Sequence, residues 1–312
     1  MPRCTIAIPA YNSAPSIDAS ILSARGQTER DIEIIVVDDA STDATGESIA
    51  AHAAQDDRLI VLNNACNGGK SVAMNRAQAV AKGDWIGVLD ADDAWLPDRA
   101  RRLIDAAEAC GADVVADNQL KVDPFARTRE GRLFDLSGEM LTLDLPAYLG
   151  SVERKVDFGT LKPLVRRDFL QRTGVAYDEN QRFSQDFSFM LELLLEGARV
   201  LVVNEALYLY TLPFSAREWR WTATGAGAWR HDFASALRTT ERYLADPRVL
   251  REPQIALLLR RRAALLRKSG VWDEVKRRRI ERGAPAAIAW LLLHPPALRV
   301  VGERLLRGRF IA

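Results

Sequence analysis

Apolar runs alternate with stretches of helical periodicity through the first 120 residues of the chain. Runs of mainly apolar residues predict buried strands at 4–10, 32–39, 58–63, 84–90 and 112–119. Apolar residues at helical spacing between them predict helices at 14–27, 43–55, 69–81 and 97–110. Strands that alternate with helices form parallel βαβ units covered on both faces. We therefore expect an α/β fold with a mainly parallel sheet sandwiched by helices.

The alternation ends near residue 120. Residues 121–150 are mixed and polar, which indicates a hairpin or loop. Residues 186–198 then predict a helix, and 199–211 one or two strands. From about residue 222 the pattern is helical, and His294-Pro295-Pro296 must break or kink the last helix because proline cannot continue it.

Charge is distributed unevenly along the chain. Residues 251–312 carry 15 Lys and Arg against 5 Asp and Glu, although the formal net charge of the whole chain is +1. This asymmetry predicts a basic C-terminal surface on an acidic body. We expect an α/β domain at 1–215, with halves at 1–120 and 121–215, followed by a helical, basic region at 216–312.

The cysteines and the apolar runs limit the cellular setting. Cys4, Cys66 and Cys110 are widely spaced and form no CxxC pair, which favours reduced thiols over disulfides or a zinc site. The first residues show no signal-peptide pattern. No run reaches the roughly 18 apolar residues that a membrane-spanning helix needs. These features favour a cytoplasmic protein.

Polar and acidic residues follow four of the predicted strands where those strands end. They are residues 9–12, 38–43, 63–71 and 90–93. Ligands of open α/β sheets bind at the carboxyl ends of the strands, so these groups are expected to form one site. The chain has no GxGxxG after its first strand and no GxxxxGK[ST] loop. Clustered carboxylates repel an anion unless a divalent cation lies between them, which predicts Mg²⁺ or Mn²⁺ at 90–93 and a diphosphate on the metal.

Three segments match, in order and spacing, the nucleotide-binding half of family-2 glycosyltransferases. They are IPAYNSAPSIDASILSARGQT, EIIVVDDASTDAT and NGGKSVAMNRAQAVAKGDWIGVLDADDAWLPD. The chain resembles this family over about residues 1–120. The resemblance implies a GT-A fold and an inverting transfer of a sugar from a nucleotide diphosphate donor, with UDP favoured over dTDP or GDP. It also implies a glycan or lipid-linked acceptor in bacterial exopolysaccharide or surface-glycan synthesis.

The resemblance assigns donor-binding roles to residues at the strand ends. The nucleoside pocket would be lined by Pro9, Ala10, Tyr11 and Asn12, with Tyr11 packing on the base. Asp38 would accept a hydrogen bond from the base, and Asp39 would shape that loop with Ser41 and Asp43. Asn67 and Gly68 would open a helix N-terminus near the base and ribose. Either Lys70 or Arg76 would help to neutralise the donor.

The same resemblance identifies the acidic turn as a DXD metal motif formed by Asp90, Ala91 and Asp92. Asp90 would lie nearer the ribose and Asp92 on the metal, and Asp93 is a competing ligand. An inverting transfer also needs a general base for the acceptor hydroxyl. The family commonly places this base in an acidic pair at a helix start. The matching segment here is RFSQDFSFMLELLLEG, in which Asp186 is the candidate base and Gln185 stands where the family often has Glu.

Two further segments bear on the acceptor. Residues 158–170 resemble the part of the family that lines the acceptor side. Processive members carry QxxRW, whereas REWRW at 217–221 lacks the Gln, which predicts the addition of a single sugar. Trp219, Trp221 and Trp229 are expected to pack in the core rather than to stack on a sugar.

Simpler roles stay open for some of these residues. Asp39 or Asp43 would also serve as a helix cap, 67–69 as a plain turn, and Asp186 as a charge at a helix N-terminus. At the level of function, a nucleotidyltransferase is disfavoured because PAYNSAPS is not a glycine-rich, basic phosphate loop. A catalytically inactive sugar-nucleotide-binding protein or membrane scaffold is the alternative.

The arginine-rich C-terminal region has three readings: a solvated helix face, a nucleic-acid surface or an anionic-membrane surface. No nucleic-acid motif accompanies it, so we expect no nucleic-acid partner. We favour the membrane interpretation, in which the protein is peripheral on the inner face of the plasma membrane. It would insert Trp290, Leu291 to Leu293 and Leu298, and would place at the headgroups Arg299, Arg304, Arg307 and Arg309.

Overall fold

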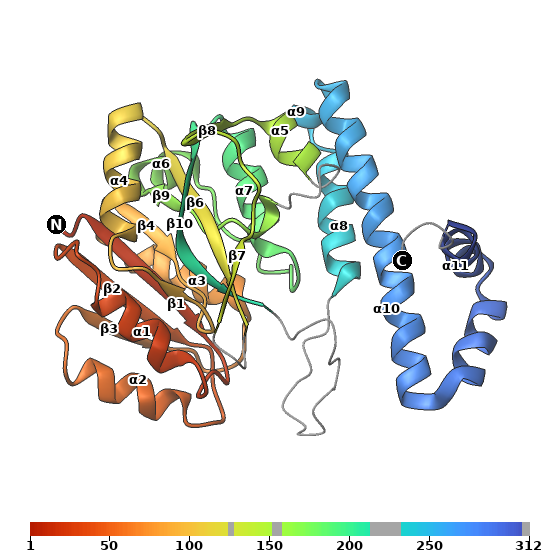
Figure 1. The fold of residues 1–312 in the computed structure, drawn as a ribbon, viewed down its shortest axis with the longest axis horizontal. Coiled ribbons are helices and arrows are strands. Elements are labelled where there is room, and N and C mark those ends of the chain that lie inside the picture. Colours follow the sequence, from red (N-terminus) through yellow and green to blue (C-terminus); the bar gives the residue numbers. More distant parts are fainter. Residues whose placement is uncertain (124–127, 152–157, 213–231, 308–312) are drawn as a thin grey trace. The chain divides into compact units, whose positions relative to one another are not determined.

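The computed structural model describes residues 1–123, 128–151, 158–212 and 232–307 (Figure 1). The chain forms two compact units, Met1–Gly225 and Ala226–Ala312. The predictions for REWRW (217–221), Trp219, Trp221, Trp229 and Arg309 concern residues outside these described ranges.

The first half of the N-terminal unit has the predicted alternation of strands and helices. Its strands are β1 (Cys4–Ala10), β2 (Ile32–Asp38), β3 (Leu59–Asn63) and β4 (Trp85–Val88). The helices are α1 (Ile17–Arg25), α2 (Thr45–Ala53), α3 (Lys70–Val80) and α4 (Arg99–Cys110). β1 pairs in parallel with both β2 and β4, and β2 pairs in parallel with β3. The carboxyl ends of these four strands therefore meet at one edge, as the sequence predicted.

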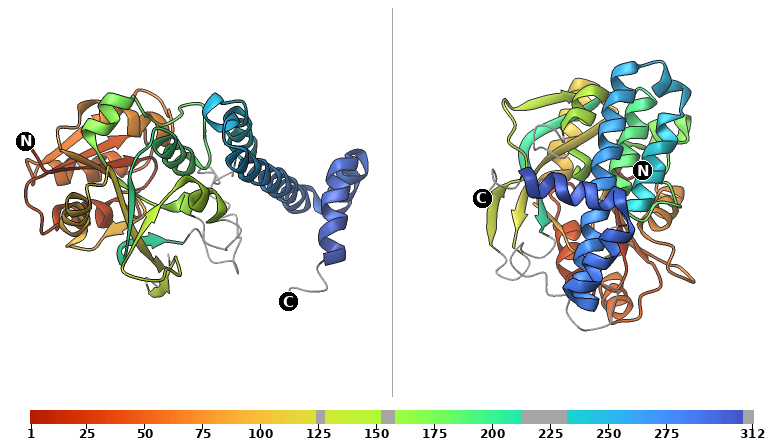
Figure 2. Two further views of the ribbon diagram at one scale, coloured as in Figure 1. Left: turned by 90° about the horizontal axis from the view of Figure 1, so that it is seen from above. Right: turned by 90° about the vertical axis from the view of Figure 1, so that its right-hand side faces the viewer.

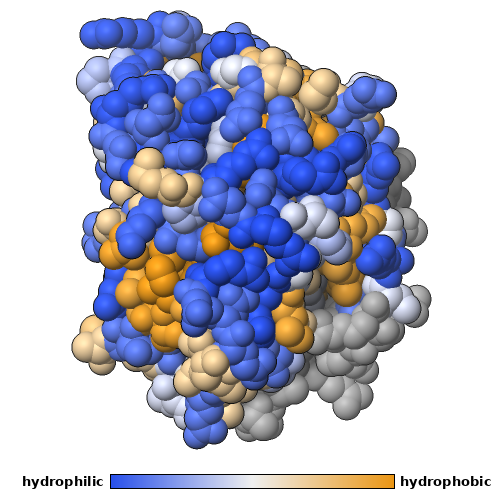
Figure 3. All heavy atoms as spheres, turned by 90° about the vertical axis from the view of Figure 1, so that its left-hand side faces the viewer, coloured by the Kyte–Doolittle hydropathy of each residue, from blue (hydrophilic) through white to orange (hydrophobic). Residues whose placement is uncertain are grey.

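Helices cover both faces of this sheet. Successive residues of a strand point to opposite faces, and Ile6 and Ile8 of β1 share the main buried cluster with Ile21 of α1 and Leu103 of α4. α3 packs against β1 and β2 through other buried residues, which lie outside that cluster. The mainly parallel, helix-covered sheet is thus confirmed. The face in Figure 3, the left-hand side of Figure 1, is mainly hydrophilic, with apolar side chains gathered in separate places.

The second half of the unit extends the same sheet. The strand order is β3-β2-β1-β4-β9-β6-β10-β5, with β7 on β6 and β8 on β10. β6 (Val114–Val122) and β10 (Val200–Thr211) are parallel to each other. The other strands pair antiparallel and are β5 (Ala94–Trp95), β7 (Arg129–Arg132), β8 (Met140–Leu143) and β9 (Leu164–Arg166). The helices are α5 (Leu145–Gly150), η2 (Phe158–Thr160), α6 (Arg167–Thr173) and α7 (Gln185–Leu195).

The C-terminal unit is helical, as predicted. It consists of α8 (Phe233–Leu244), α9 (Pro247–Leu250), α10 (Pro253–Leu293) and α11 (Pro295–Arg307). α8 packs beside α10 (Figure 2). The predicted break at His294 is present, and α10 contains a second one at Gly283, whose φ of 82° is not helical.

The two breaks bound a short apolar helical segment, residues 284–293, which packs against the part of α10 that precedes Gly283. Leu291 is buried with Ala297 and Val301 of α11, and Trp272 of α10 packs against them. Among the described residues, no single helix has the length and apolarity to cross a bilayer. The segments Glu281–Leu293 and Pro295–Gly302 meet that requirement only as a pair, which is bent by 113°.

Candidate active site

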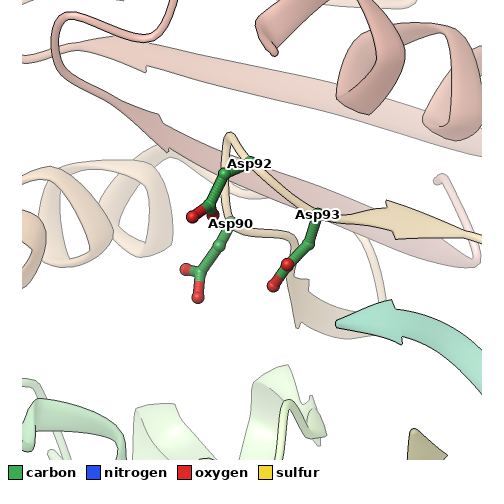
Figure 4. Close-up of side chains that lie close together, drawn as sticks. All are labelled: Asp90, Asp92 and Asp93. Carbon is green, nitrogen blue, oxygen red and sulfur yellow. The ribbon is translucent and has the colours of Figure 1, made fainter. Parts of the chain in front are cut away.

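The acidic turn between β4 and β5 brings three carboxylates together. The N–H of Asp93 donates to the carbonyl oxygen of Asp90 at 3.0 Å, which closes the turn. Ligand oxygens of Asp90, Asp92 and Asp93 lie within 4.8 Å of one another, and Figure 4 shows the three side chains side by side. Such a set of hard oxygen donors fits Mg²⁺ or Mn²⁺.

Asp92 and Asp93 differ in what their carboxylates contact. Asp92 is exposed and forms no ion pair with another described residue. Asp93 is 3% exposed; Tyr208 Oη donates to its Oδ2 and the N–H of Thr211 to its Oδ1, both at 2.7 Å. Burial and the neighbouring Asp92 and Asp90 carboxylates raise the pKa of Asp93 well above its ordinary value. Asp93 therefore ties the turn to β10, whereas the Asp92 carboxylate is open to a ligand.

Two lysines join Asp90 to Asp186. Lys70 Nζ lies 2.7 Å from Asp90 Oδ1 and 2.8 Å from Asp186 Oδ1. Lys162 Nζ lies 2.6 Å from Asp90 Oδ2 and 2.5 Å from Asp186 Oδ2. Carboxylates and ammonium groups thus alternate around a closed ring. The predicted base, Asp186, and the first aspartate of the acidic turn, Asp90, therefore contact the same two ammonium groups.

The ring shifts the pKa of two of its members, Asp90 and Lys162. Burial raises the pKa of Asp90, but the Lys162 and Lys70 ammonium groups lower it more, so that it lies well below its ordinary value. Burial lowers the pKa of Lys162, but the Asp186 and Asp90 carboxylates raise it well above its ordinary value. Both groups are therefore charged at neutral pH.

Contacts between α3 and the segment before α7 bring Lys70 to Asp186. Asn75 of α3 donates from Nδ2 to the carbonyl oxygen of Tyr177 at 2.9 Å and accepts the Tyr177 N–H at 2.8 Å. Lys70 is the first residue of α3, and Asp186 lies in the first turn of α7. The paired hydrogen bonds at Asn75 therefore bring the beginnings of the two helices together.

A buried arginine is hydrogen-bonded to the backbone of Lys162, a member of the ring. Arg99, the first residue of α4, is fully buried and donates to Asp117 Oδ1 from Nε at 3.0 Å and Nη2 at 2.7 Å. Its Nη2 also donates to the carbonyl oxygen of Lys162 at 2.5 Å. The guanidinium lies over the rings of Trp95, at 4.2 Å, and Tyr208, at 5.0 Å. Arg99 thus links the backbone of Lys162 to the tyrosine that holds Asp93.

Asp39 organises the loop that leads into α3. It is 2% exposed and accepts from Asn64 Nδ2 at 2.6 Å, from the Gly68 N–H at 2.9 Å and from the Gly69 N–H at 2.6 Å. Gly69 has a φ of 82°, and a Cβ there would collide with the Arg182 guanidinium. The positive φ favours glycine at this position, because other residues rarely adopt it.

The glycosyltransferase assignment rests on comparison with known proteins. Residues 5–155 match the profile of the family described as Glycosyl transferase family 2. Over these residues the chain belongs to this family. It is 37% identical over 215 residues to the succinoglycan biosynthesis protein ExoO of Rhizobium meliloti (strain 1021), and 32% identical over 211 residues to the uncharacterized glycosyltransferase EpsJ of Bacillus subtilis (strain 168). Each match covers 67% of this chain and 61% of the relative, so the chain spans about three fifths of these relatives.

Solved structures share the GT-A fold of this chain. S. aureus TarS 1–349 in complex with UDP-GlcNAc aligns with a TM-score of 0.66 at 18% identity, over 97% of this chain and 82% of TarS. The mannosyltransferase PcManGT of Pyrobaculum calidifontis, in complex with GDP-Man and Mn²⁺, aligns with a TM-score of 0.60 at 20% identity, over 99% and 81%. The predicted GT-A fold class is thereby confirmed.

The other residues predicted to bind the donor lie around the strand ends. Pro9 and Ala10 end β1, and Tyr11 beyond them is 47% exposed. Asn12 has a φ of 47°, and its Oδ1 accepts the Thr42 N–H at 2.8 Å. Asp38 ends β2 and accepts the Ser41 N–H at 2.9 Å. The exposed Tyr11 ring is open to a base.

The two predicted basic residues occupy different places in the structure. Lys70 belongs to the ring, whereas Arg76 Nη1 contacts the carbonyl oxygen of Asn63 and Oδ1 of Asn64, both at 2.5 Å. Of the other predicted residues, Asn67 is exposed and Ala91 is buried. The structure thus groups Lys70, but not Arg76, with the candidate base.

Sequence reasoning missed Lys162 and Arg99. Lys162 stands in a segment singled out only as the acceptor side, and its two carboxylate partners are 72 and 24 positions away. Arg99 is followed closely by Arg101 and Arg102, which are both exposed. No local signal separates a buried arginine from these neighbours, because burial depends on β6 and β10.

Proposed function

We propose that this protein is an inverting, metal-dependent glycosyltransferase that adds a single sugar from a nucleotide diphosphate sugar to a glycan or lipid-linked acceptor. The pathway proposed is bacterial exopolysaccharide or surface-glycan synthesis, and the name of ExoO, a succinoglycan biosynthesis protein, supports it. The observation that supports the proposal most is the ring of Asp90, Lys70, Asp186 and Lys162, because the Asp186 carboxylate lies beside the acidic turn in it.

The donor proposed is a UDP-sugar. Support comes from the TarS structures with UDP and UDP-GlcNAc, and from WfaP of Escherichia coli, whose name specifies UDP-Glc and which is 43% identical over 97 residues. Tyr11 would pack on the base, and Asp38, Asn67 and Gly68 would surround the nucleoside. Lys70 would neutralise part of the diphosphate.

Mg²⁺ or Mn²⁺ would be held by Asp92, with Asp90 beside it. Its chemistry when bound would be to stabilise the charge that develops on the leaving diphosphate. Asp92 suits this role because it is exposed and free of ion pairs with other described residues, whereas both carboxylate oxygens of Asp93 accept hydrogen bonds from β10. We therefore propose Asp92 as the principal ligand and a holding role for Asp93.

Asp186 would act as the general base. As the acceptor hydroxyl oxygen forms its bond to the anomeric carbon, its proton passes to the Asp186 carboxylate. The bond from the anomeric carbon to the diphosphate oxygen breaks, and its electron pair leaves with the nucleoside diphosphate. Attack from the face opposite the leaving group inverts the anomeric configuration. Transfer of one sugar only rests on the sequence of residues 217–221.

Asp92→Ala is the substitution that tests the metal site. We expect Mn²⁺ to tighten the binding of the UDP-sugar to the wild type, and the variant to lose about 10²-fold in that affinity because a metal ligand is gone. Isothermal titration of UDP-GlcNAc and UDP-Glc, with Mn²⁺ and with EDTA, measures both effects. The matched control is Asp84→Asn, because Asp84 is an exposed carboxylate just before the opposite end of β4.

Two results would contradict this assignment. If neither EDTA nor Asp92→Ala changes the affinity for the donor, the acidic turn does not bind a metal that holds the donor. Metal-dependent binding without any transfer, to a panel of glycan and lipid-linked acceptors, would favour the inactive sugar-nucleotide-binding scaffold.

The C-terminal unit is proposed to lie on an anionic membrane from the cytoplasmic side. Ile288, Leu292 and Leu293 of α10 are exposed, at 57%, 65% and 78%, as is Leu298 of α11 at 44%. Residues 283–298 contain no Lys, Arg, Asp or Glu, whereas 276–282 and 299 supply basic side chains. An apolar surface with basic flanks suits insertion among anionic headgroups. The name of WfaP specifies a diphosphoundecaprenol-linked acceptor, which is held in a membrane.

Leu292→Asp with Leu293→Asp is expected to reduce binding to anionic vesicles by at least about tenfold, because two inserted side chains become charged. Flotation with phosphatidylglycerol vesicles, and with phosphatidylcholine vesicles for comparison, measures it. Leu250→Asp with Leu257→Asp is the control, since these leucines are also exposed in this unit, at 59% and 47%. Equal flotation of both variants and the wild type would contradict the proposal.

A further inference from the structure

Lys162 is a buried lysine whose ammonium group lies between carboxylates from two different parts of the fold. Its side chain is 5% exposed, and Nζ contacts Asp90, after β4, and Asp186, in α7. A buried ammonium group is costly unless it is paired and hydrogen-bonded. The Lys162 ammonium group therefore depends on both carboxylates for its pairing, and the pairing fixes the positions of the two carboxylates relative to each other.

Lys162 is held more firmly than Lys70, the other lysine of the ring. Arg99 donates to the carbonyl oxygen of Lys162 at 2.5 Å, and Gln119 Nε2 donates to that of Thr160 at 2.9 Å. The backbone around Lys162 is thus hydrogen-bonded to buried residues of α4 and β6. Lys70 begins α3, and its side chain is 19% exposed. Lys70 can turn toward a diphosphate, whereas Lys162 cannot leave its carboxylates without unpairing in the interior.

We propose that Lys162 is a positioning residue of the transfer reaction. Its ammonium group holds the Asp186 carboxylate in the orientation that receives the acceptor proton. The same ammonium group is paired with Asp90, which lies on the donor side of the site. The inference rests on the function proposed above, in which Asp186 is the base. A misplacement of about 1 Å costs about 10²-fold in rate, so a loss of this size is expected when the ammonium group is removed.

A double-mutant cycle distinguishes a positioning role from a merely structural one. Lys162→Met keeps an unbranched side chain, one atom shorter, and removes the ammonium group. In the wild-type background we expect it to lower kcat by about 10²-fold with little change in the KM for the UDP-sugar. In the Asp186→Asn background we expect little further loss, because a group that acts through Asp186 has nothing left to position. Equal fold-losses in the two backgrounds would overturn the inference.

The controls separate this inference from the proposed function. Lys82→Met removes an exposed lysine that follows α3 and should keep wild-type kcat. If Asp186→Asn itself keeps wild-type kcat, the base assignment fails and this inference fails with it. If Asp186→Asn lowers kcat but Lys162→Met lowers it equally in both backgrounds, only the inference about Lys162 fails. Should Lys162→Met not fold, Lys162→Arg replaces it in the cycle, with a smaller loss that must again vanish beside Asp186→Asn.

Discussion

Asp186→Asn is expected to lower the kcat of sugar transfer by about 10²- to 10⁴-fold, the range that a general base contributes. An amide cannot take the acceptor proton, but it has nearly the same size as the carboxylate and leaves Lys162 paired with Asp90. Donor affinity should therefore be largely kept. Steady-state transfer rates and titration of the UDP-sugar in the presence of Mn²⁺ measure the two quantities separately.

Glu196→Gln is the matched control, because Glu196 is an exposed carboxylate at the other end of the same helix, α7. It should retain wild-type kcat and donor affinity. Parallel loss of donor binding and turnover in Asp186→Asn would assign Asp186 to donor binding instead. Unchanged turnover would exclude Asp186 as the base.

Arg99→Met is expected to destabilise the N-terminal unit by about 3–5 kcal/mol, the usual cost of removing one partner of a buried ion pair. Asp117 is 1% exposed, and its carboxylate would lose the hydrogen bonds that the Arg99 guanidinium donates to it. Burial raises the pKa of Asp117 while Arg99 lowers it, so the unpaired carboxyl would take up a proton more readily. Urea unfolding followed by tryptophan fluorescence measures the change in free energy.

Arg101→Met is the control for this substitution. Arg101 lies in the same helix and pairs with Asp98, but its side chain is 46% exposed. An exposed pair contributes about 0–1 kcal/mol, so the control should unfold near the wild type. Arg99→Met with Asp117→Leu should recover much of the loss, because no unpaired charge remains. Equal stability of the Arg99 and Arg101 variants would contradict the structural role of Arg99.

The sequence allowed the first four strands to be predicted because each is a run of mainly apolar residues bounded by polar residues. β9 and β5 have three and two residues, which are too few to show a period. β9 enters the sheet between β4 and β6, although β6 precedes it in the chain by more than 40 residues. Such an insertion is decided by side chains that are distant in sequence.

The same limit applies to the site. Asp90, Asp92 and Asp93 could be grouped from the sequence because they are nearly adjacent and follow a strand. Asp186 could be named because its segment resembles the one in which the family places its base. That one ammonium group contacts both Asp90 and Asp186 depends on where Lys162 lies in the folded chain, and a lysine followed by proline carries no sign of burial.

Thr211 gives the acidic turn an unexpected dependence on the order of synthesis. Its N–H donates to Asp93 Oδ1 at 2.7 Å, and its Oγ1 donates to the carbonyl oxygen of Asp92 at 2.6 Å, across more than 100 residues of chain. β1 to β4 can pair while the chain is still growing from its N-terminus, but β10 is made last in this sheet. A nascent chain that has not yet emerged past Thr211 therefore carries the aspartates without the strand that fixes them.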